Sequence, residues 1–332
     1  MATYRKRGNA WRVEISKNGI RKSGTFDTKK EAKEWAVNVE SDIAAGKYNA
    51  SSKLSIQYVF DKYKDEECIK HDGERWEKLR LDKIARELPS IKFSELTSLH
   101  ISGWKNKRLK SVKESTVRRE MVLLSQVFNT ALNEWKFISE SPLKGVKKPP
   151  EPPPRRRHIT KKEIKLMMKS LSYQDGVIAE RTIDEVAIAF LIGIETAMRA
   201  GEILSINKVV NYKGNEYFNE VNLRKRTVFI GKTKNGESRY VPLTKKAMSL
   251  IKCLPDRQFT VSSASLSSLF RKYRIKAEIN DLTFHDSRSE GITRLSKKVD
   301  VLMLAKIIGH KDIKSLMFYY NESAENIAKL LD

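Results

Sequence analysis

The chain begins with a stretch that alternates apolar and polar positions, the pattern of a half-buried strand. Residues 10–16 alternate in this way, and an Asn-Gly pair at 18–19 supplies a two-residue turn into a second strand at 20–26. A capping box at Thr28 then opens a helix that runs through about Ala45. We expect a small antiparallel sheet with this helix on one face. The helix residues that face the sheet are Ala32, Trp35, Ala36 and Val39.

The middle of the chain changes to helical spacing. Apolar residues recur every three or four positions through residues 54–142, and this spacing predicts a compact helical domain. Ser115 or Thr116 is placed to cap its last long helix. The apolar stripe of that helix consists of Val122, Leu123, Val127, Phe128, Ala131 and Trp135.

Residues 158–332 combine helices with one short sheet. A second capping box, at residues 160–163, opens the first helix of this segment. Strands are predicted at residues 227–230 and 239–243, joined through Asn235-Gly236. The remainder has the pattern of helices. We expect a mainly helical domain with a small β-sheet.

A proline-rich stretch separates the helical middle from this last segment. Six of the nine prolines fall within residues 142–154. Such sequence favours an extended polyproline conformation, so residues 143–157 are predicted to form a basic linker. A softer break falls near residues 48–52. The chain is therefore predicted to be a multidomain α+β protein, with parts at 1–50, 54–142 and 158–332.

The charge balance indicates a polyanion as the binding partner. Lys and Arg number 65 against 41 Asp and Glu, which gives a formal net charge of +24. A hydrophobic content of 40% is too high for a disordered basic tail. No apolar run reaches the roughly 18 residues of a membrane span, and the basic start lacks an apolar signal region. We expect a cytoplasmic, nucleoid-associated protein that does not enter membranes.

Basic residues gather where each part of the chain could meet DNA. The open face of the first sheet is basic, and a sheet face or β-ribbon can enter a major groove. A second cluster precedes the last long helix of the middle part, and a third lies in the linker, where it would neutralise phosphates. The alternative for each cluster is an ordinary solvated surface. The candidate DNA-contact residues are Arg5, Lys6, Arg7, Arg12, Arg21, Lys22, Lys105, Lys107, Arg108, Arg118, Arg119, Arg155, Arg156 and Arg157.

Six residues in the last segment form a set of side chains that can catalyse phosphoryl transfer without a metal. Arginine forks clamp the non-bridging oxygens and stabilise the charge of the transition state. A tyrosine hydroxyl, with an unperturbed pKa of about 10, attacks phosphorus when a base or a cationic field assists it. Histidines supply that assistance, and a lysine protonates the leaving 5′ oxygen. The candidates are Arg199, Lys234, His285, Arg288, His310 and Tyr319.

Each candidate has a structural alternative when it is taken alone. Arg199, for example, is also placed to pair with the nearby acid Glu202. No metal or other cofactor is expected, because acidic residues do not recur at the spacing of a two-metal site. Cys68 and Cys253 lie far apart and outside any CxxC pair, which argues against a zinc site or a disulfide framework.

Five segments carry the six candidates with distinctive flanks. They are ETAMRAGEIL with Arg199, GKTKNGESRYVPL with Lys234, TFHDSRSEGITRL with His285 and Arg288, IIGHKDIKSL with His310, and MFYYN with Tyr319. In this order they resemble the tyrosine recombinases, and in particular the phage integrases. The family's spacing after the second histidine selects Tyr319 over Tyr320 as the nucleophile. Its spacing before the hairpin's Val-Pro selects Lys234, with Lys232 as second choice.

The resemblance implies a three-domain integrase similar to lambda integrase. Residues 1–50 would form an arm-type DNA-binding domain of three strands and a helix, and residues 54–142 a core-binding helical domain. The linker at 143–157 would lead into a catalytic domain at 158–332. Its tail, 321–332, would dock on a neighbouring protomer.

The resemblance also implies an activity, site-specific integration and excision of phage or mobile-element DNA. Tyr319 would form a 3′-phosphotyrosyl link without ATP, and strand exchange would pass through a Holliday junction. Arg199 and Arg288 would hold the phosphate, the histidines would share proton transfer, and Lys234 would be the general acid. The expected partners are double-stranded DNA with core-type and arm-type sites, a homotetramer on that DNA, a host DNA-bending factor and an excision protein. The alternatives are a type IB topoisomerase-like enzyme and a non-enzymatic architectural DNA-binding protein.

Overall fold

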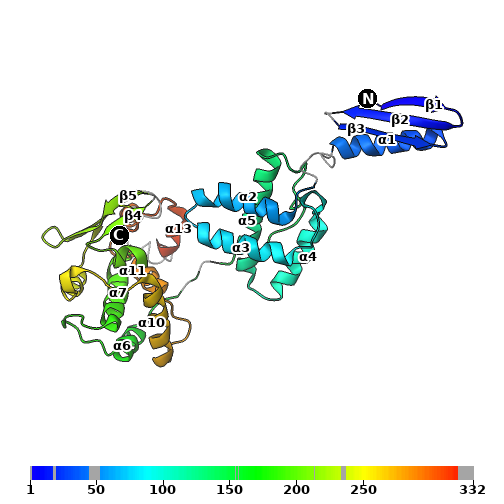
Figure 1. Ribbon diagram of the computed structural model, residues 1–332. Coiled ribbons are helices and arrows are strands. Elements are labelled where there is room, and N and C mark those ends of the chain that lie inside the picture. The colour runs from blue at the N-terminus through cyan, green and yellow to red at the C-terminus, as the bar shows by residue number, and fades with distance from the viewer. Residues whose placement is uncertain are drawn as a thin grey trace, which may run out of the picture. The chain divides into compact units, whose positions relative to one another are not determined.

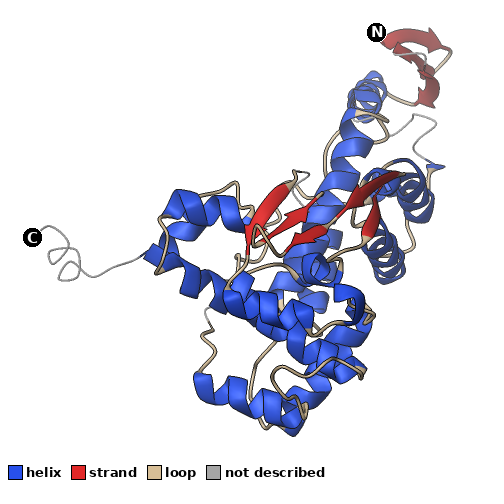
Figure 2. Ribbon diagram, turned by 90° about the vertical axis from the view of Figure 1, so that its left-hand side faces the viewer, coloured by secondary structure: helices blue, strands red, loops and turns tan. Residues whose placement is uncertain are grey.

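The computed structural model describes residues 2–17, 20–44, 53–153, 155, 157–212, 214–232 and 237–320. Its contacts divide the chain into two units, 1–154 and 155–332, and each is described by itself (Figure 1). The boundary falls inside the predicted linker. Helices make up most of the described chain, and the strands are short (Figure 2). None of the described helices is long and apolar enough to cross a membrane.

The N-terminal elements are β1 (Ala2–Arg7), β2 (Ala10–Lys17), β3 (Ile20–Phe26) and α1 (Lys29–Ala44). The strands form an antiparallel sheet in the order β1-β2-β3. Val13 of β2 and Ala36 of α1 belong to one buried core, which confirms the predicted helix face. The predicted cap is present, since the Glu31 amide donates to Thr28 Oγ1 at 3.2 Å. The predicted Asn18-Gly19 turn lies outside the described residues.

The elements of the helical part are α2 (Ile56–Glu66), η2 (Cys68–Lys70), α3 (Glu74–Glu87), η3 (Phe93–Glu95), α4 (Ser98–Leu109) and α5 (Glu114–Asn133). Their apolar faces share one core, in which Phe128 is fully buried. Two details differ from expectation. Lys113, and neither Ser115 nor Thr116, is the cap residue of α5. Val122 is 43% exposed and does not belong to the buried stripe.

The helices of the second unit are α6 (Lys161–Ser170), α7 (Thr182–Thr196), α8 (Ala200–Leu204), α9 (Lys245–Lys252), η4 (Pro255–Arg257), α10 (Ser263–Lys276), α11 (His285–Ser296), α12 (Val301–Ile308), α13 (Lys314–Met317) and η5 (Phe318–Tyr320). Its strands are β4 (Val209–Tyr212), β5 (Asn215–Phe218), β6 (Glu220–Asn222), β7 (Thr227–Ile230) and β8 (Arg239–Pro242). The core is built around α7, which is buried along nearly its whole length and contacts α9, α10 and α11.

The prediction of a single two-stranded sheet in this unit was wrong. β7 has the predicted bounds, and β8 ends one residue earlier than expected. However, β6 adds a third strand in the order β6-β7-β8, and β4 and β5 form a separate hairpin. These strands have three or four residues each, which is too short for an alternating pattern to stand out from the background.

Two glycines allow α7 and α11 to approach each other closely (Figure 1). A Cβ atom on Gly291 of α11 would lie 2.7 Å from the carbonyl oxygen of Gly193 on α7. A Cβ atom on Gly193 would in turn collide with the Ser287 hydroxyl. Because ordinary contacts of a Cβ begin near 3.4 Å, this crossing requires glycine on both helices. The crossing fixes the position of α11, which carries two of the candidate residues.

The linker is attached at the side of the first unit. Arg118 on α5 donates from Nη1 to the carbonyl of Pro149 at 2.8 Å. Lys105 on α4 donates to the carbonyl of Lys147 at 3.3 Å. Arg118 and Lys105 therefore hold the backbone of the linker against the helical part.

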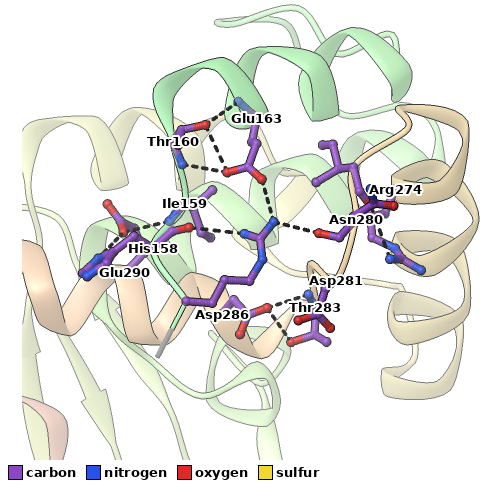
Figure 3. Close-up of polar contacts among 12 residues, drawn as sticks. His158, Ile159, Thr160, Glu163, Arg274, Asn280, Asp281, Thr283, Asp286 and Glu290 are labelled. Carbon is purple, nitrogen blue, oxygen red and sulfur yellow. Dashed lines mark hydrogen bonds and ion pairs between the residues drawn. The ribbon is translucent and has the colours of Figure 1, made fainter. Parts of the chain in front are cut away.

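The second unit begins with a strap of polar contacts that leads into α6 (Figure 3). Thr160 and Glu163 form the predicted capping box, with the Glu163 amide 3.1 Å from Thr160 Oγ1. Arg157 donates to the Glu163 carboxylate and to the carbonyl of Asn280, the latter at 2.9 Å. The Ile159 amide donates to buried Glu290 of α11 at 3.2 Å. The strap thus ties the start of this unit to α11 and to the loop before it.

Candidate active site

Arg199 lies at the sharp turn between α7 and α8. Ala197 follows α7 in a left-handed conformation, with φ of 55°, and redirects the chain. Arg199 is the N-cap residue of α8. Its backbone amide and its Nη1 donate to Glu202 at 2.8 and 3.0 Å. The guanidinium is thereby oriented while 23% of the side chain stays exposed.

Arg288 lies on α11 and is almost fully buried. Its Nη1 donates to the carbonyl of Ala197 at 2.6 Å, and its Nη2 donates to that of Ile308 at 3.0 Å. Burial, followed by the positive charge of Arg199, lowers the pKa of Arg288 to about 10. The side chain therefore remains protonated at neutral pH. It joins the Arg199 turn to the end of α12.

His285 is the first residue of α11, three positions before Arg288, so both lie on one side of the helix. Burial, followed by the charge of Arg288, lowers the pKa of His285. The next residue, Asp286, accepts from the Thr283 amide at 2.7 Å and so ties the start of the helix to the segment before it. A neutral imidazole at pH 7 is able to accept a proton.

His310 follows the end of α12. Gly309 terminates that helix in a left-handed conformation, with φ of 66°, and His310 Nδ1 lies 3.0 Å from Ser315 Oγ. Burial, followed by the charges of Arg288 and Arg199, lowers the pKa of His310. Both candidate histidines are therefore neutral imidazoles beside cations at pH 7.

The two neighbouring tyrosines have different surroundings. The Tyr320 hydroxyl donates to the carbonyl of Val299 at 2.6 Å. Tyr319 instead interacts with Ser289 of α11 and with the charge of Arg288. Burial raises the pKa of Tyr319, although Ser289 and Arg288 oppose that rise. Tyr319 is thus the tyrosine that interacts with the buried arginine, and its proton must pass to a base before it attacks.

Lys234 and the predicted Asn235-Gly236 turn lie outside the described residues. The second choice, Lys232, is described. Its ammonium group lies 3.9 Å from the ring centroid of Tyr212 and 5.1 Å from that of Tyr217. These cation–π contacts hold Lys232 on the β4-β5 hairpin.

Five of the six candidates interact electrostatically although they come from segments far apart in the chain. The pKa of Arg288 responds to Arg199 and Tyr319, and the pKa values of both histidines respond to the two arginines. The cluster therefore offers two cations, two neutral imidazoles and one hydroxyl. Within the described ranges, no group of three or more His, Cys, Asp or Glu is placed to hold a metal ion.

Comparison with known proteins identifies the family. A family model described as the phage integrase family matches residues 157–326. A putative integrase/recombinase of Haemophilus influenzae is 37% identical to the chain, over 98% of this chain and 89% of its own length. The chain belongs to the phage integrase family. The matched region contains every candidate catalytic residue, and the resemblance to tyrosine recombinases is confirmed.

Solved integrase structures share the fold of this integrase-family chain. A lambda integrase dimer bound to a COC′ core site superposes with a TM-score of 0.63 at 16% identity, over 95% of this chain and 93% of the other. A lambda integrase tetramer bound to a Holliday junction gives a TM-score of 0.62 at 17% identity, over 93% and 95%. The predicted mixture of helical domains and small sheets is therefore confirmed.

Sequence reasoning treated one important residue of this integrase as an alternative and missed another. Glu202 was considered only as a structural partner of Arg199, yet its two oxygens accept bonds from Arg199 and also from Arg239. The spacing of Glu202, three residues after Arg199, was the signal for its role. Arg239 lies 37 residues from Glu202, and no local pattern connects the two.

In the N-terminal sheet, the strand register shows which of the predicted DNA contacts lie on its open face. Arg5 pairs with Arg12, on the face opposite buried Val13. Lys6 pairs with Trp11 and Lys22 pairs with Ile15, so both lie on the side that carries the helix. The open face therefore presents Arg5, Arg7, Arg12 and Arg21.

In the helical domain, the prediction for Arg108 needs a correction. Arg108 is 5% exposed and donates through Nε and Nη2 to fully buried Glu120, each at 2.9 Å. Its guanidinium is thus inside the domain, and we withdraw it from the DNA contacts. Lys107 and Arg119 are exposed, and their DNA contacts stay predictions. Lys105 and Arg118 also stay candidates, although both bond the linker.

The linker arginines are engaged within the catalytic unit. Arg155 donates to both oxygens of Asp286, at 2.8 and 2.9 Å, and to Asp281 at 2.9 Å. Arg157 pairs with Glu163. Carboxylates therefore compensate the charges that were expected to lie along DNA, and these two side chains anchor the chain beside His285. Arg156 lies outside the described residues.

Proposed function

We propose that this tyrosine recombinase integrates and excises phage or mobile-element DNA through a 3′-phosphotyrosyl intermediate, with Tyr319 as nucleophile. The observation that carries the proposal is the coupled cluster of Tyr319, Arg199, Arg288 and two neutral histidines within the family-matched region. The Haemophilus relative is named an integrase/recombinase, which supports site-specific recombination as the activity.

The proposed cleavage step follows from the surroundings of each group. The Tyr319 oxygen forms a bond to phosphorus while the bond from phosphorus to the 5′ oxygen breaks. The phenol proton passes to a neutral imidazole, of His285 or His310, because burial keeps the tyrosine protonated at neutral pH. Arg199 and Arg288 stabilise the charge on the non-bridging oxygens, and Lys234 protonates the leaving 5′ oxygen.

Rejoining reverses the same bonds. The 5′ hydroxyl of a partner duplex attacks the phosphotyrosyl link and gives its proton back to the Lys234 amine, while the tyrosine oxygen leaves with the proton returned by the imidazole. The number of phosphodiester bonds is conserved, so no ATP is consumed. Attack on a partner duplex instead of the original strand turns cleavage into recombination.

The proposed assembly is a homotetramer on DNA, in which residues 1–50 bind arm-type sites and residues 54–142 bind core-type sites. Support comes from lambda integrase, whose solved structures include a dimer on a core site and a tetramer on a Holliday junction. The basic open face of the N-terminal sheet supports arm-site binding. The host DNA-bending factor, the excision protein and the docking tail at 321–332 stay predictions.

The test is covalent capture on nicked suicide duplexes tiled across the DNA that flanks the gene. Wild-type protein should give a denaturant-resistant adduct on one duplex, with the link at Tyr319. Tyr319→Phe should retain DNA affinity and lose the adduct, whereas the matched control Tyr320→Phe should retain both. An adduct that persists in Tyr319→Phe would refute the nucleophile. Supercoil relaxation at random sites by the wild type would instead indicate a topoisomerase.

A further inference from the structure

Arg239 connects the segments of the active site, and it is not one of the candidate residues. It begins β8, five positions after Lys234 in the sequence. Its side chain is only 8% exposed, in a unit whose surface is rich in solvated cations. A buried arginine of this kind must have all of its charge and most of its donors satisfied by the protein.

Two of its donors are used on the residue that orients Arg199. Nη1 of Arg239 donates to one oxygen of Glu202 at 2.9 Å, and Nη2 donates to the other at 2.8 Å. The same two oxygens accept from the side chain and backbone of Arg199. One buried carboxylate therefore lies between two guanidinium groups, and the three groups together carry one net positive charge.

The third donor reaches the turn that carries His310. Nε of Arg239 donates to the carbonyl of Ile307 at 2.9 Å, and Arg288 donates to the next carbonyl, of Ile308. Both carbonyls belong to the last turn of α12, where the helix dipole favours cations. Arg239 also packs on Gly309, since a Cβ there would meet its Nη1 at 3.1 Å. His310 follows this glycine directly.

We propose that Arg239 is a positioning residue of the recombinase. It donates to both oxygens of the Glu202 carboxylate, so that the charge of Arg199 remains directed at the scissile phosphate. It also holds the turn that carries His310 close to the same carboxylate. This role rests on the proposed function. Without Arg239, Arg199 would be the sole arginine facing a buried carboxylate, and its guanidinium would move toward Glu202 and away from DNA.

The first measurement is the rate of covalent adduct formation at saturating suicide duplex. Arg239→Gln should lower this rate about 100-fold, the cost of an ångström-scale displacement of a catalytic group, with DNA affinity nearly unchanged. Arg239→Lys should not restore it, because an ammonium group lacks the planar fork that the three acceptors require. The matched control is Arg226→Gln, since Arg226 directly precedes β7 of the same sheet but donates only to the carbonyl of Leu243 among the contacts described.

Two modified duplexes separate positioning of Arg199 from other roles. A methylphosphonate at the scissile position removes the charge that Arg199 must meet, so the defect of Arg239→Gln should shrink to about threefold. A 5′-bridging phosphorothiolate provides a leaving group that needs no proton, so it should rescue Lys234→Ala and leave Arg239→Gln slow. The opposite pattern, in which the phosphorothiolate alone rescues Arg239→Gln, would overturn the proposal, because Arg239 would then act by positioning Lys234.

Two further outcomes would also overturn it. If Arg239→Gln melts below the assay temperature and regains the wild-type rate on cooling, Arg239 only stabilises the fold. If wild-type protein forms no adduct on any duplex, the proposed function itself fails. Inorganic phosphate is then titrated into wild type and Arg239→Gln while the Arg199 Nε–H signal is followed by NMR. The proposal requires weaker phosphate binding by the variant, and equal binding would refute it.

Discussion

The close crossing of α7 and α11 gives a sharp prediction for Gly291→Ala. The new Cβ would lie 2.7 Å from the Gly193 carbonyl oxygen, against 3.4 Å for an ordinary contact, so α11 must move by about 0.7 Å. Atoms of Ala197 lie 3.0 Å away on the same side, so side-chain rotation cannot relieve the clash. Overpacking of this kind costs about 1–3 kcal/mol, which is a fall of roughly 2–12 °C in Tm for a unit of this size.

The same movement should impair catalysis more than it impairs the fold. Arg288 lies on α11 and bonds the carbonyl of Ala197 at 2.6 Å, so a displaced helix stretches this contact. A shift of about 0.7 Å should slow adduct formation by roughly tenfold to a hundredfold, measured below both melting temperatures. Gly201→Ala is the matched control, because a Cβ on that helical glycine meets nothing within 4 Å. A Gly291→Ala protein that melts and cleaves like wild type would refute the argument.

Two further predictions concern charged pairs. Arg108→Ala should destabilise the helical part by about 3–5 kcal/mol, because it leaves the buried Glu120 carboxylate without its cation. Urea unfolding measures this loss, and the exposed Lys107→Ala is the control, for which we expect almost no change in stability. Burial alone would raise the pKa of Asp286, but Arg155 and the Thr283 backbone lower that pKa overall. The ion pair of Arg155 and Asp286 therefore stabilises the fold fully above the unfolded pKa of about 4. This stabilisation is lost as the pH falls through the lower pKa of the native state. Arg155→Gln should therefore lower Tm less at about pH 3 than at pH 7. An equal loss at both values would contradict this assignment.

Local patterns in the sequence predicted the features that depend on local physics. The capping box at Thr160 and Glu163 and the strand Thr227–Ile230 each depend on a few neighbouring residues. The burial of Arg108 was also predictable from its spacing. Ile101, Trp104 and Arg108 recur at helical intervals on one face of α4, and all three are buried. The cluster of basic residues around it obscured that stripe.

Contacts between distant segments were beyond such reasoning. Arg155 and Asp286 are 131 residues apart, and the sequence shows only a basic linker and a capping residue at those positions. Likewise, nothing near Arg239 indicates that its fork meets Glu202. These pairings arise only when packing of the domain brings the segments together, and they decide which arginines of a +24 chain have their charge neutralised.

The partner of each arginine therefore separates structural from catalytic roles better than its exposure does. Arg155 is paired with the carboxylates of Asp281 and Asp286, so its charge is cancelled where it lies. Arg288 is far more buried, yet it is held by the carbonyls of Ala197 and Ile308, which orient it without adding a negative charge. A guanidinium held by dipoles keeps its full charge for a phosphate, and the site is thus preorganised before DNA arrives. By the same reasoning Arg199, which does share a carboxylate, keeps its charge for DNA only as long as a second arginine satisfies Glu202.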